Sequence, residues 1–368
     1  MGEISLRRGQ PGAAVDIAML GLSHNPNNKA LLLLKARSEA VRSPILAVPT
    51  LKLLCELDPN DIDVTIRLSN TYVLIGEYQK AIDLLKKKIN NGNLSTMNQR
   101  RCMTSLASAM YKNGSKEEAF KEIDSLIESE PNDPGPFMAQ IQLLKEDFLW
   151  GQIKSKTIEW YQSHDGKDKV PVVIARDLVA VDDNRARQVA EEVLLYVLSK
   201  DENNTEVLGV LAILMEVMGR SDESIEYYTN ILKLEPNNLI ALNNLAWLLC
   251  EKKEQYQEAL KLAEKGLKIA PNYTDLIDTR GIVYYRLGQI DKAIQDFNKC
   301  IKLYPNNMTS SVVTHFHLAR ALALNGEKSK AIESLNLTFE LNNRIGGLSA
   351  SDLAEAKDLY KQLTEEDS

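Results

Sequence analysis

The chain has 368 residues, of which 44% are hydrophobic and 26% are charged, as in ordinary folded domains. Its net charge of −7 argues against a nucleic-acid partner, because binding to phosphates depends on clustered lysine and arginine. No apolar stretch approaches the roughly 18 residues of a transmembrane helix, and charged residues interrupt the N-terminal segment where a signal peptide would be apolar.

A small residue followed twelve positions later by proline recurs along the chain. Alanine takes the small position in most cases, and serine takes it once, at Ser224 and Pro236. A glycine precedes several of these residues by five positions, as at Gly114, Gly219 and Gly288. The period of about 34 residues indicates a solenoid, in which each unit packs only on its neighbours. The alanine pairs are Ala14/Pro26, Ala47/Pro59, Ala119/Pro131, Ala259/Pro271 and Ala293/Pro305.

The first units are expected at about 28–61, 62–93 and 100–133, after an incomplete unit at the N-terminus. Only the residues up to Arg8 precede Gly9, where a first helix should end, so we expect a fragment of a longer protein. In the unit at 28–61, Pro44 suits a helix start, but Pro49 should bend or delay that helix.

Between 134 and 201 the recurrent glycine and alanine disappear, although a stripe of large apolar residues keeps helical spacing. The polar segment 164–169 is the best candidate for a hinge. Clean repeats resume at Thr205, and a last helix with Ser351 as its N-cap should close the array before an acidic tail. We therefore expect N-terminal units at 1–133, degenerate repeats at 134–202, C-terminal units at 203–343, and a capping helix with the tail at 344–368. The apolar stripe comprises Phe137, Leu144, Trp150, Ile153 and Trp160.

The unit at 274–307 illustrates why each repeat should hold two helices. Apolar residues recur every three or four positions in its first half and again in its second half. Gly288 separates the two halves with a left-handed turn, and Pro305 ends the second. The small residues Gly281 and Ala293 would let the two helix axes approach closely. Each repeat is therefore predicted to be a helix-turn-helix.

This pattern resembles the tetratricopeptide repeat (TPR) family. The resemblance implies an all-α, right-handed superhelical solenoid of about ten helix-turn-helix repeats with a C-terminal capping helix. Arg280 departs from the family pattern at a position where leucine is usual. The matching positions in this unit are Ile277, Gly281, Tyr284, Gly288, Ala293, Phe297, Cys300 and Pro305.

A narrower resemblance covers about 205–365. The segments ALNNLAWLL at 241–249, LAEKGLKIAP at 262–271 and GIVYY at 281–285 resemble bacterial envelope TPR proteins tied to exopolysaccharide export and PEP-CTERM sorting. This resemblance implies a bacterial scaffold in the periplasm or at the outer membrane, while a cytoplasmic location stays open.

Motifs for catalysis or cofactor binding are missing from the sequence, including GxSxG, HExxH, Walker A and the dinucleotide fingerprint. His315 and His317 lie two residues apart and should point to different sides of a helix, so they make poor shared metal ligands. The four cysteines are widely spread and suit small apolar positions. We therefore expect a chain that is not an enzyme and needs neither cofactor nor metal.

The concave groove is the remaining candidate site, because in TPR arrays the first helix of each unit lines it at fixed positions. Trp247 stands out, since an exposed tryptophan in a concave site is a typical binding residue; packing against the next helix pair is the alternative. Asp275 and Thr279 occupy positions where the carboxylate-clamp subtype carries cations, which disfavours binding of a chaperone tail. The expected partner-binding residues are Asn243, Asn244, Trp247, Glu251, Asp278, Ile282, Tyr285, Arg286, Phe316 and Arg320, and Thr279 and His317 map to the same surface.

These observations favour a non-catalytic scaffold that binds a protein or peptide segment in its groove. Two alternatives stay open: a docking or regulatory module of a larger enzyme or secretion machine, and a polysaccharide-binding groove. The sequence indicates neither the partner's identity nor the oligomeric state.

Overall fold

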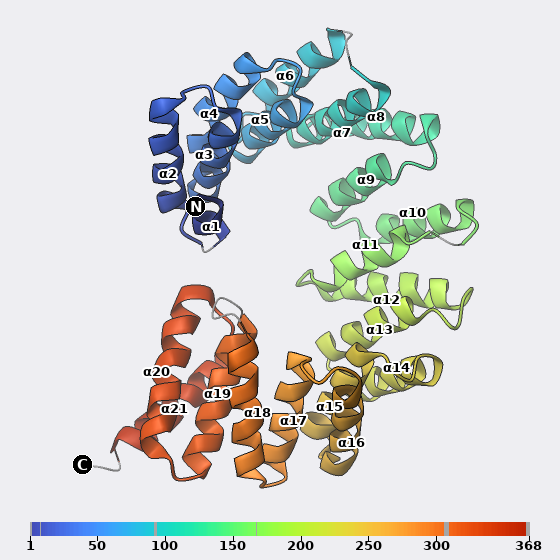
Figure 1. Cartoon of the computed structure of the whole chain (residues 1–368). Coiled ribbons are helices and arrows are strands. Elements are labelled where there is room, and N and C mark those ends of the chain that lie inside the picture. Colours follow the sequence, from blue (N-terminus) through green and yellow to red (C-terminus); the bar gives the residue numbers. More distant parts are fainter. Residues whose placement is uncertain (1, 8, 92–93, 167, 305–308, 366–368) are drawn as a thin grey trace. The chain divides into compact units, whose positions relative to one another are not determined.

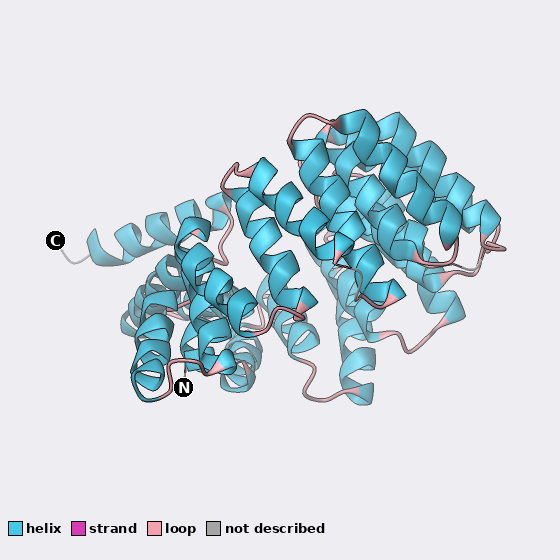
Figure 2. Cartoon of the chain, turned by 90° about the horizontal axis from the view of Figure 1, so that it is seen from above, coloured by secondary structure: helices cyan, strands magenta, loops and turns pink. Residues whose placement is uncertain are grey.

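The structure is a computed structural model that describes residues 2–7, 9–91, 94–166, 168–304 and 309–365 (Figure 1). Helices joined by short loops make up these residues, and no β-strand occurs among them (Figure 2). None of the described helices is both long and apolar enough to cross a membrane. The chain divides into two compact units, Met1–Val170 and Pro171–Ser368. The four segments expected from the sequence remain a proposal.

The N-terminal unit consists of consecutive helices that pack on one another in pairs. Its large apolar residues keep their place even where the recurrent glycine and alanine are missing. Phe137 stacks on Trp160 with ring centroids 4.4 Å apart, and both side chains are buried, as the apolar stripe predicts. The helices are α1 (Gly2–Arg7), α2 (Pro11–His24), α3 (Lys29–Arg42), α4 (Pro44–Leu57), α5 (Ile62–Leu74), α6 (Tyr78–Asn90), α7 (Thr96–Lys112), α8 (Lys116–Ser129), α9 (Pro134–Glu146) and α10 (Trp150–Ser163).

From α13 onward the C-terminal unit continues the pairing, and it ends with one additional helix. The described residues thus form 21 helices in an all-α repeat array, as the repeat pattern predicts. The helices are α11 (Val170–Val179), which starts at the boundary, α12 (Asn184–Leu198), α13 (Thr205–Val217), α14 (Ser221–Leu234), α15 (Leu239–Lys253), α16 (Tyr256–Ile269), α17 (Thr274–Arg286), α18 (Ile290–Leu303), α19 (Thr309–Leu324), α20 (Lys328–Ile345) and α21 (Ala350–Glu365).

The recurrent small residues lie where paired helices touch. A Cβ atom added to Gly281 of α17 would come within 2.5 Å of Cε1 of Phe297 on α18, so no larger residue fits without a shift of the ring. Gly288 connects the two helices with φ +71°, the left-handed turn expected there. The small residues that start the second helix of the regular pairs have no exposed surface: Ala14, Ala47, Ala81, Ala119, Ser224, Ala259, Ala293 and Ala331.

Arg280, the departure from the family pattern, forms a polar link within its helix pair. Its Nε and Nη2 atoms donate to the two carboxylate oxygens of Asp296 on α18, each at 2.7 Å. The Asp296 side chain is only 9% exposed, and the Arg280 guanidinium lies 5.6 Å from the ring centroid of Tyr284. A two-point ion pair therefore takes the place of the apolar contact that leucine would make.

Two details of the helix ends differ from expectation. Of the two effects expected of Pro49, a bend or a delay, the delay does not occur, because α4 begins at Pro44 and continues through Pro49 to Leu57. The capping residue of α21 is Ser349 instead of Ser351, because the Ser349 hydroxyl accepts a hydrogen bond from the backbone N–H of Asp352 at 3.0 Å. The helix end expected at Pro305 and the acidic tail expected after Glu365 fall outside the described residues.

Asp296→Ala should lower the free energy of unfolding by about 2–3 kcal/mol, because it leaves the Arg280 guanidinium partly buried without a partner. Adding Arg280→Leu, the usual family residue, should recover part of this loss by removing the unpaired charge. Urea unfolding of the full chain followed by circular dichroism measures both variants. Equal losses for the single and double variants would contradict the structural role given to this pair.

Candidate functional site: a pocket on the first helices of the C-terminal unit

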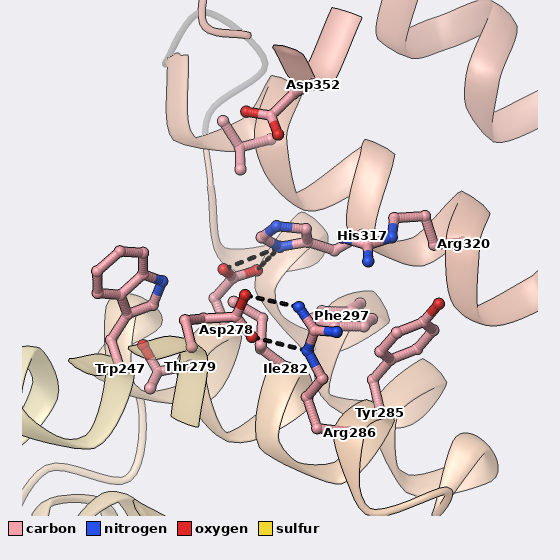
Figure 3. Close-up of a pocket in the computed structure, with 12 residues that line it drawn as sticks. Trp247, Asp278, Thr279, Ile282, Tyr285, Arg286, Phe297, His317, Arg320 and Asp352 are labelled. Atoms are coloured by element: carbon pink, nitrogen blue, oxygen red, sulfur yellow. Dashed lines mark hydrogen bonds and ion pairs between the residues drawn. The ribbon is translucent and has the colours of Figure 1, made fainter. Parts of the chain in front are cut away.

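Side chains from several helices of the C-terminal unit surround a pocket of about 300 Å³ (Figure 3). Three successive first helices, α15, α17 and α19, supply most of them, while α18 and α21 supply one each. The lining residues are Trp247 and Glu251 of α15; Asp278, Thr279, Ile282, Tyr285 and Arg286 of α17; Phe297 of α18; Val313, His317 and Arg320 of α19; and Asp352 of α21.

Helical spacing explains the contribution of α17. Asp278, Ile282 and Tyr285 follow one another at steps of four and three residues, which places them on one face of the helix. Gly281 lies beside this face and lets the ring of Phe297 come close from α18. The small residue that sets the helix spacing therefore also brings an aromatic ring to the pocket.

Arg286 and Glu251 form a two-point ion pair that joins α17 to α15. The Arg286 Nε atom donates to Glu251 Oε1 at 2.8 Å, and Nη2 donates to Oε2 at 2.7 Å. Burial acts to raise the pKa of the Glu251 carboxyl, but the hydrogen bonds and charge of Arg286 outweigh it and hold the pKa below its ordinary value. Burial also raises the pKa of the adjacent Cys250 thiol to about 12, so this thiol stays protonated and poorly nucleophilic.

Asp278 accepts hydrogen bonds from the next first helix. The hydroxyl of Thr314 donates to Asp278 Oδ1 at 2.9 Å, and His317 Nδ1 lies 3.2 Å from Oδ2. Because a carboxylate can only accept, Nδ1 of His317 carries a proton in this contact. An equivalent contact links the preceding helices, where Thr279 donates to Asn243 Oδ1 at 2.8 Å. Polar contacts thus fix the spacing of successive first helices.

Arg320 connects three of the helices around the pocket. Its Nε atom lies 3.1 Å from Glu355 Oε1 on α21, and its guanidinium carbon lies 5.0 Å from the ring centroid of Tyr285 on α17. A second depression of about 740 Å³ between α19 and α21 also includes Tyr285 and Arg320 in its lining. The final helix is therefore tied to the wall of the pocket.

Trp247 both packs against neighbouring helices and lines the pocket. Its side chain is half-buried and packs against the core formed by α13 to α18, while it also lines the pocket. The Lys252 ammonium lies 5.5 Å from its ring centroid. The tryptophan is thus held in place and remains accessible from the pocket.

The pocket brings together seven of the ten expected binding residues, together with Thr279 and His317. Asn243 and Asn244 do not line it, and Asn244 donates to the Tyr228 hydroxyl at 2.7 Å. The expectation for Phe316 was wrong: its side chain is 1% exposed and packs in a core with Leu335 of α20 and Ala356 of α21. Phe316 lies on α19, the first helix of the final pair, and α21 covers it. The seven are Trp247, Glu251, Asp278, Ile282, Tyr285, Arg286 and Arg320.

Three lining residues were missed from the sequence. Val313 lies on the first helix of its unit, three residues before Phe316, and was not among the residues expected from the sequence. Phe297 belongs to a second helix but faces Gly281, so the glycine was an available signal. Asp352 lies on the final helix, outside the repeat to which the rule applies. The two histidines do point to different sides: burial lowers the pKa of His315, and His317 lines the pocket.

Comparison with known families identifies the repeat. Two family profiles described as tetratricopeptide repeat match residues 227–261 and 248–316, which cover α15 to α18 and parts of their neighbours. This chain contains tetratricopeptide repeats. Proteins built from this repeat in general mediate protein–protein interactions.

Known proteins match only parts of the chain. A TPR repeat-containing protein of Pseudomonas aeruginosa is 30% identical over 77 residues, which are 21% of this chain and 13% of that protein. Small glutamine-rich tetratricopeptide repeat-containing protein 2 of Saccharomyces cerevisiae is 29% identical over 135 residues, 36% of each chain. The chain therefore spans at most about a third of the length of these two relatives. The solved structure of MamA, from position 41 to its end, from Desulfovibrio magneticus is similar with a TM-score of 0.40 and 22% identity, over 47% of this chain and 96% of that one.

Glu251→Gln should lower the melting temperature at pH 7, because Arg286 loses its charged partner. The pKa of Glu251 is lower in the folded chain than its unfolded value of about 4.3, so the stabilisation is present above that value and is lost as pH falls through the folded pKa. The difference in melting temperature from the wild type should therefore be constant from about pH 6 to 8 and shrink toward pH 3. Glu333→Gln, on an exposed part of α20, is the matched control. A difference that persists unchanged at pH 3 would contradict the ion-pair contribution.

Proposed function

We propose that the C-terminal unit binds a segment of a partner protein in the pocket of α15, α17 and α19, with Trp247 as its principal contact. The observation that carries this proposal is the convergence of Trp247, Ile282 and Tyr285 with a few charged groups in one concavity. Binding pockets are typically apolar and aromatic concavities with a small number of oriented polar groups. Partly accessible tryptophan and tyrosine side chains contribute disproportionately to binding energy in protein interfaces.

The rigidity of the pocket supports the same function. Its side chains come from helices and not from loops, and Glu251, Asp278 and Arg320 are each held by an ion pair or hydrogen bonds to another helix. A partner segment would therefore meet side chains that are already ordered. Binding to a preordered site loses less conformational entropy than binding to a mobile one.

A protein segment fits the pocket better than a polysaccharide does. The side-chain amides of Asn243 and Asn244 are among the groove groups that could form hydrogen bonds with sugar hydroxyls. Both amides are occupied, since Asn243 accepts from Thr279 and Asn244 donates to Tyr228. The remaining surface is aromatic and charged, which suits side chains of a peptide.

The resemblance of residues 205–365 to bacterial envelope TPR proteins supports the proposal that the chain binds its partner in a cell-envelope or exopolysaccharide assembly. Fractionation of native cells tests this part of the proposal. Recovery of the protein with the periplasm or outer membrane supports it, and recovery only with the cytosol contradicts it.

Trp247→Ala should weaken binding of a partner segment at least about tenfold, because it removes the largest apolar contact of the pocket. The free energy of unfolding should fall by less than the roughly 3–5 kcal/mol that truncation of a fully buried tryptophan costs, since this side chain is half-buried. Fluorescence anisotropy with peptides selected from a random display library measures binding, and thermal melts measure stability.

Ala293→Leu is the control for this test. Ala293 has no exposed surface and lies at the contact of α17 with α18, so leucine should cost about 1–3 kcal/mol through overpacking. Wild-type affinity in Trp247→Ala would rule out the proposed contact.

A further inference from the structure

The negative charges of the pocket are unequally compensated. The pocket is lined by three carboxylates, and Glu251 is paired with Arg286. Asp278 instead accepts from Thr314 and His317, and Asp352 accepts from the Ser349 hydroxyl at 2.7 Å. Within the described ranges, no lysine or arginine pairs with Asp278 or Asp352. Two carboxylates in one pocket therefore lack a cationic partner from a permanently charged side chain.

The positive charges of the pocket, by contrast, are already engaged. Arg286 is bound at two points by Glu251, and Arg320 is paired with Glu355 and stacked on Tyr285. In Figure 3, Asp278 lies between Trp247 and His317, Asp352 lies above His317 at the top of the view, and Arg320 and Tyr285 lie on the side away from Trp247. The two arginines of the pocket are thus paired with Glu251 and Glu355 and not with Asp278 or Asp352.

The Trp247 ring is also suited to contact with a cation. A positive charge within about 6 Å of a tryptophan ring centroid is attracted by the negative face of the ring. The same kind of contact already occurs in the chain, where the Lys252 ammonium lies 5.5 Å from the Trp247 ring centroid. Ile282 adds an apolar surface against which the methylene groups of a long side chain can pack.

We infer that this pocket takes a lysine or arginine side chain of the partner segment, with its cationic group bound by Asp278 and Asp352 and its methylene groups against Trp247 and Ile282. The inference rests on the proposed function, because it names the chemistry of the segment that the same pocket binds. An acidic segment would meet two carboxylates without cationic partners and is disfavoured by charge repulsion.

Panning a random 12-residue display library on the full chain tests the inference. Binders are divided into those that lose binding to Trp247→Ala and those that do not. Among the Trp247-dependent peptides, lysine or arginine should be enriched at one position. Trp247-dependent peptides without this enrichment would overturn the inference and leave the proposed function intact. If no selected peptide depends on Trp247, the proposed function fails and the inference fails with it.

A mutant cycle gives the sharper measurement. The tightest basic peptide is compared with the same peptide carrying norleucine at the enriched position, on the wild type and on Asp278→Asn. Asparagine keeps the shape and an acceptor oxygen for Thr314 but removes the charge. The basic peptide should bind Asp278→Asn at least about tenfold more weakly, and the norleucine peptide should bind both proteins alike.

Asp352→Asn should give the same pattern with a comparable or smaller loss. The matched control is Asp358→Asn, which removes a carboxylate of α21 that lines the neighbouring depression and not this pocket. It should change the affinity of neither peptide. If Asp278→Asn weakens both peptides equally, or if Asp358→Asn weakens the basic peptide as much as Asp278→Asn does, the assignment of the cation to this pocket is wrong.

Discussion

Close contact between paired helices at glycine and alanine is the constraint on which the rest of this structure depends. At Gly281 there is no room for a Cβ atom beside the ring of Phe297, and the alanine or serine near the start of each regular second helix is fully buried. Short side chains let the axes approach, so the two helices of a pair stack with little freedom to rotate. Because the rotation of α17 is fixed, Asp278, Ile282 and Tyr285 line the pocket, and Ile282 and Tyr285 also pack against the core at its edge.

The polar contacts between first helices then determine the geometry of the pocket. Asn243 with Thr279, and Asp278 with Thr314, each join residues 36 positions apart on successive first helices. The ion pair of Glu251 with Arg286 is a second link between α15 and α17, near the C-terminal ends of both helices. Groups that line the pocket therefore also hold the repeats together. Ion pairs and hydrogen bonds fixed before a partner arrives reduce the entropy lost on binding.

The sequence predicted the helices and their close contacts well, because both depend on local spacing. Gly288 and Ala293 lie where the repeat requires them, and seven of the ten predicted groove residues line one pocket. The failures arise at the end of the array. Phe316 occupies a position that lines the pocket in the preceding unit, but α21 covers it here. Asp352 joins the pocket from a helix that has no counterpart in the repeat pattern.

Other features depend on interactions that periodicity does not contain. The pairing of Glu251 with Arg286 depends on the rotation of one repeat on the next, and no local pattern specifies it. Arg280 breaks the family pattern, and its charge is compensated by Asp296, sixteen residues away on the paired helix. Pro49 lies inside α4 although proline removes a backbone donor from the helix, and spacing along the chain does not predict that it is tolerated there.

The central claim is that the pocket formed by α15, α17 and α19 is a binding site. A crystal structure of the full chain bound to its tightest library-selected peptide tests it most directly. The account predicts a peptide side chain inside the pocket, in contact with Trp247 and within hydrogen-bonding distance of Asp278. A peptide seated on second helices, or on the unit Met1–Val170, with the pocket unoccupied would contradict it.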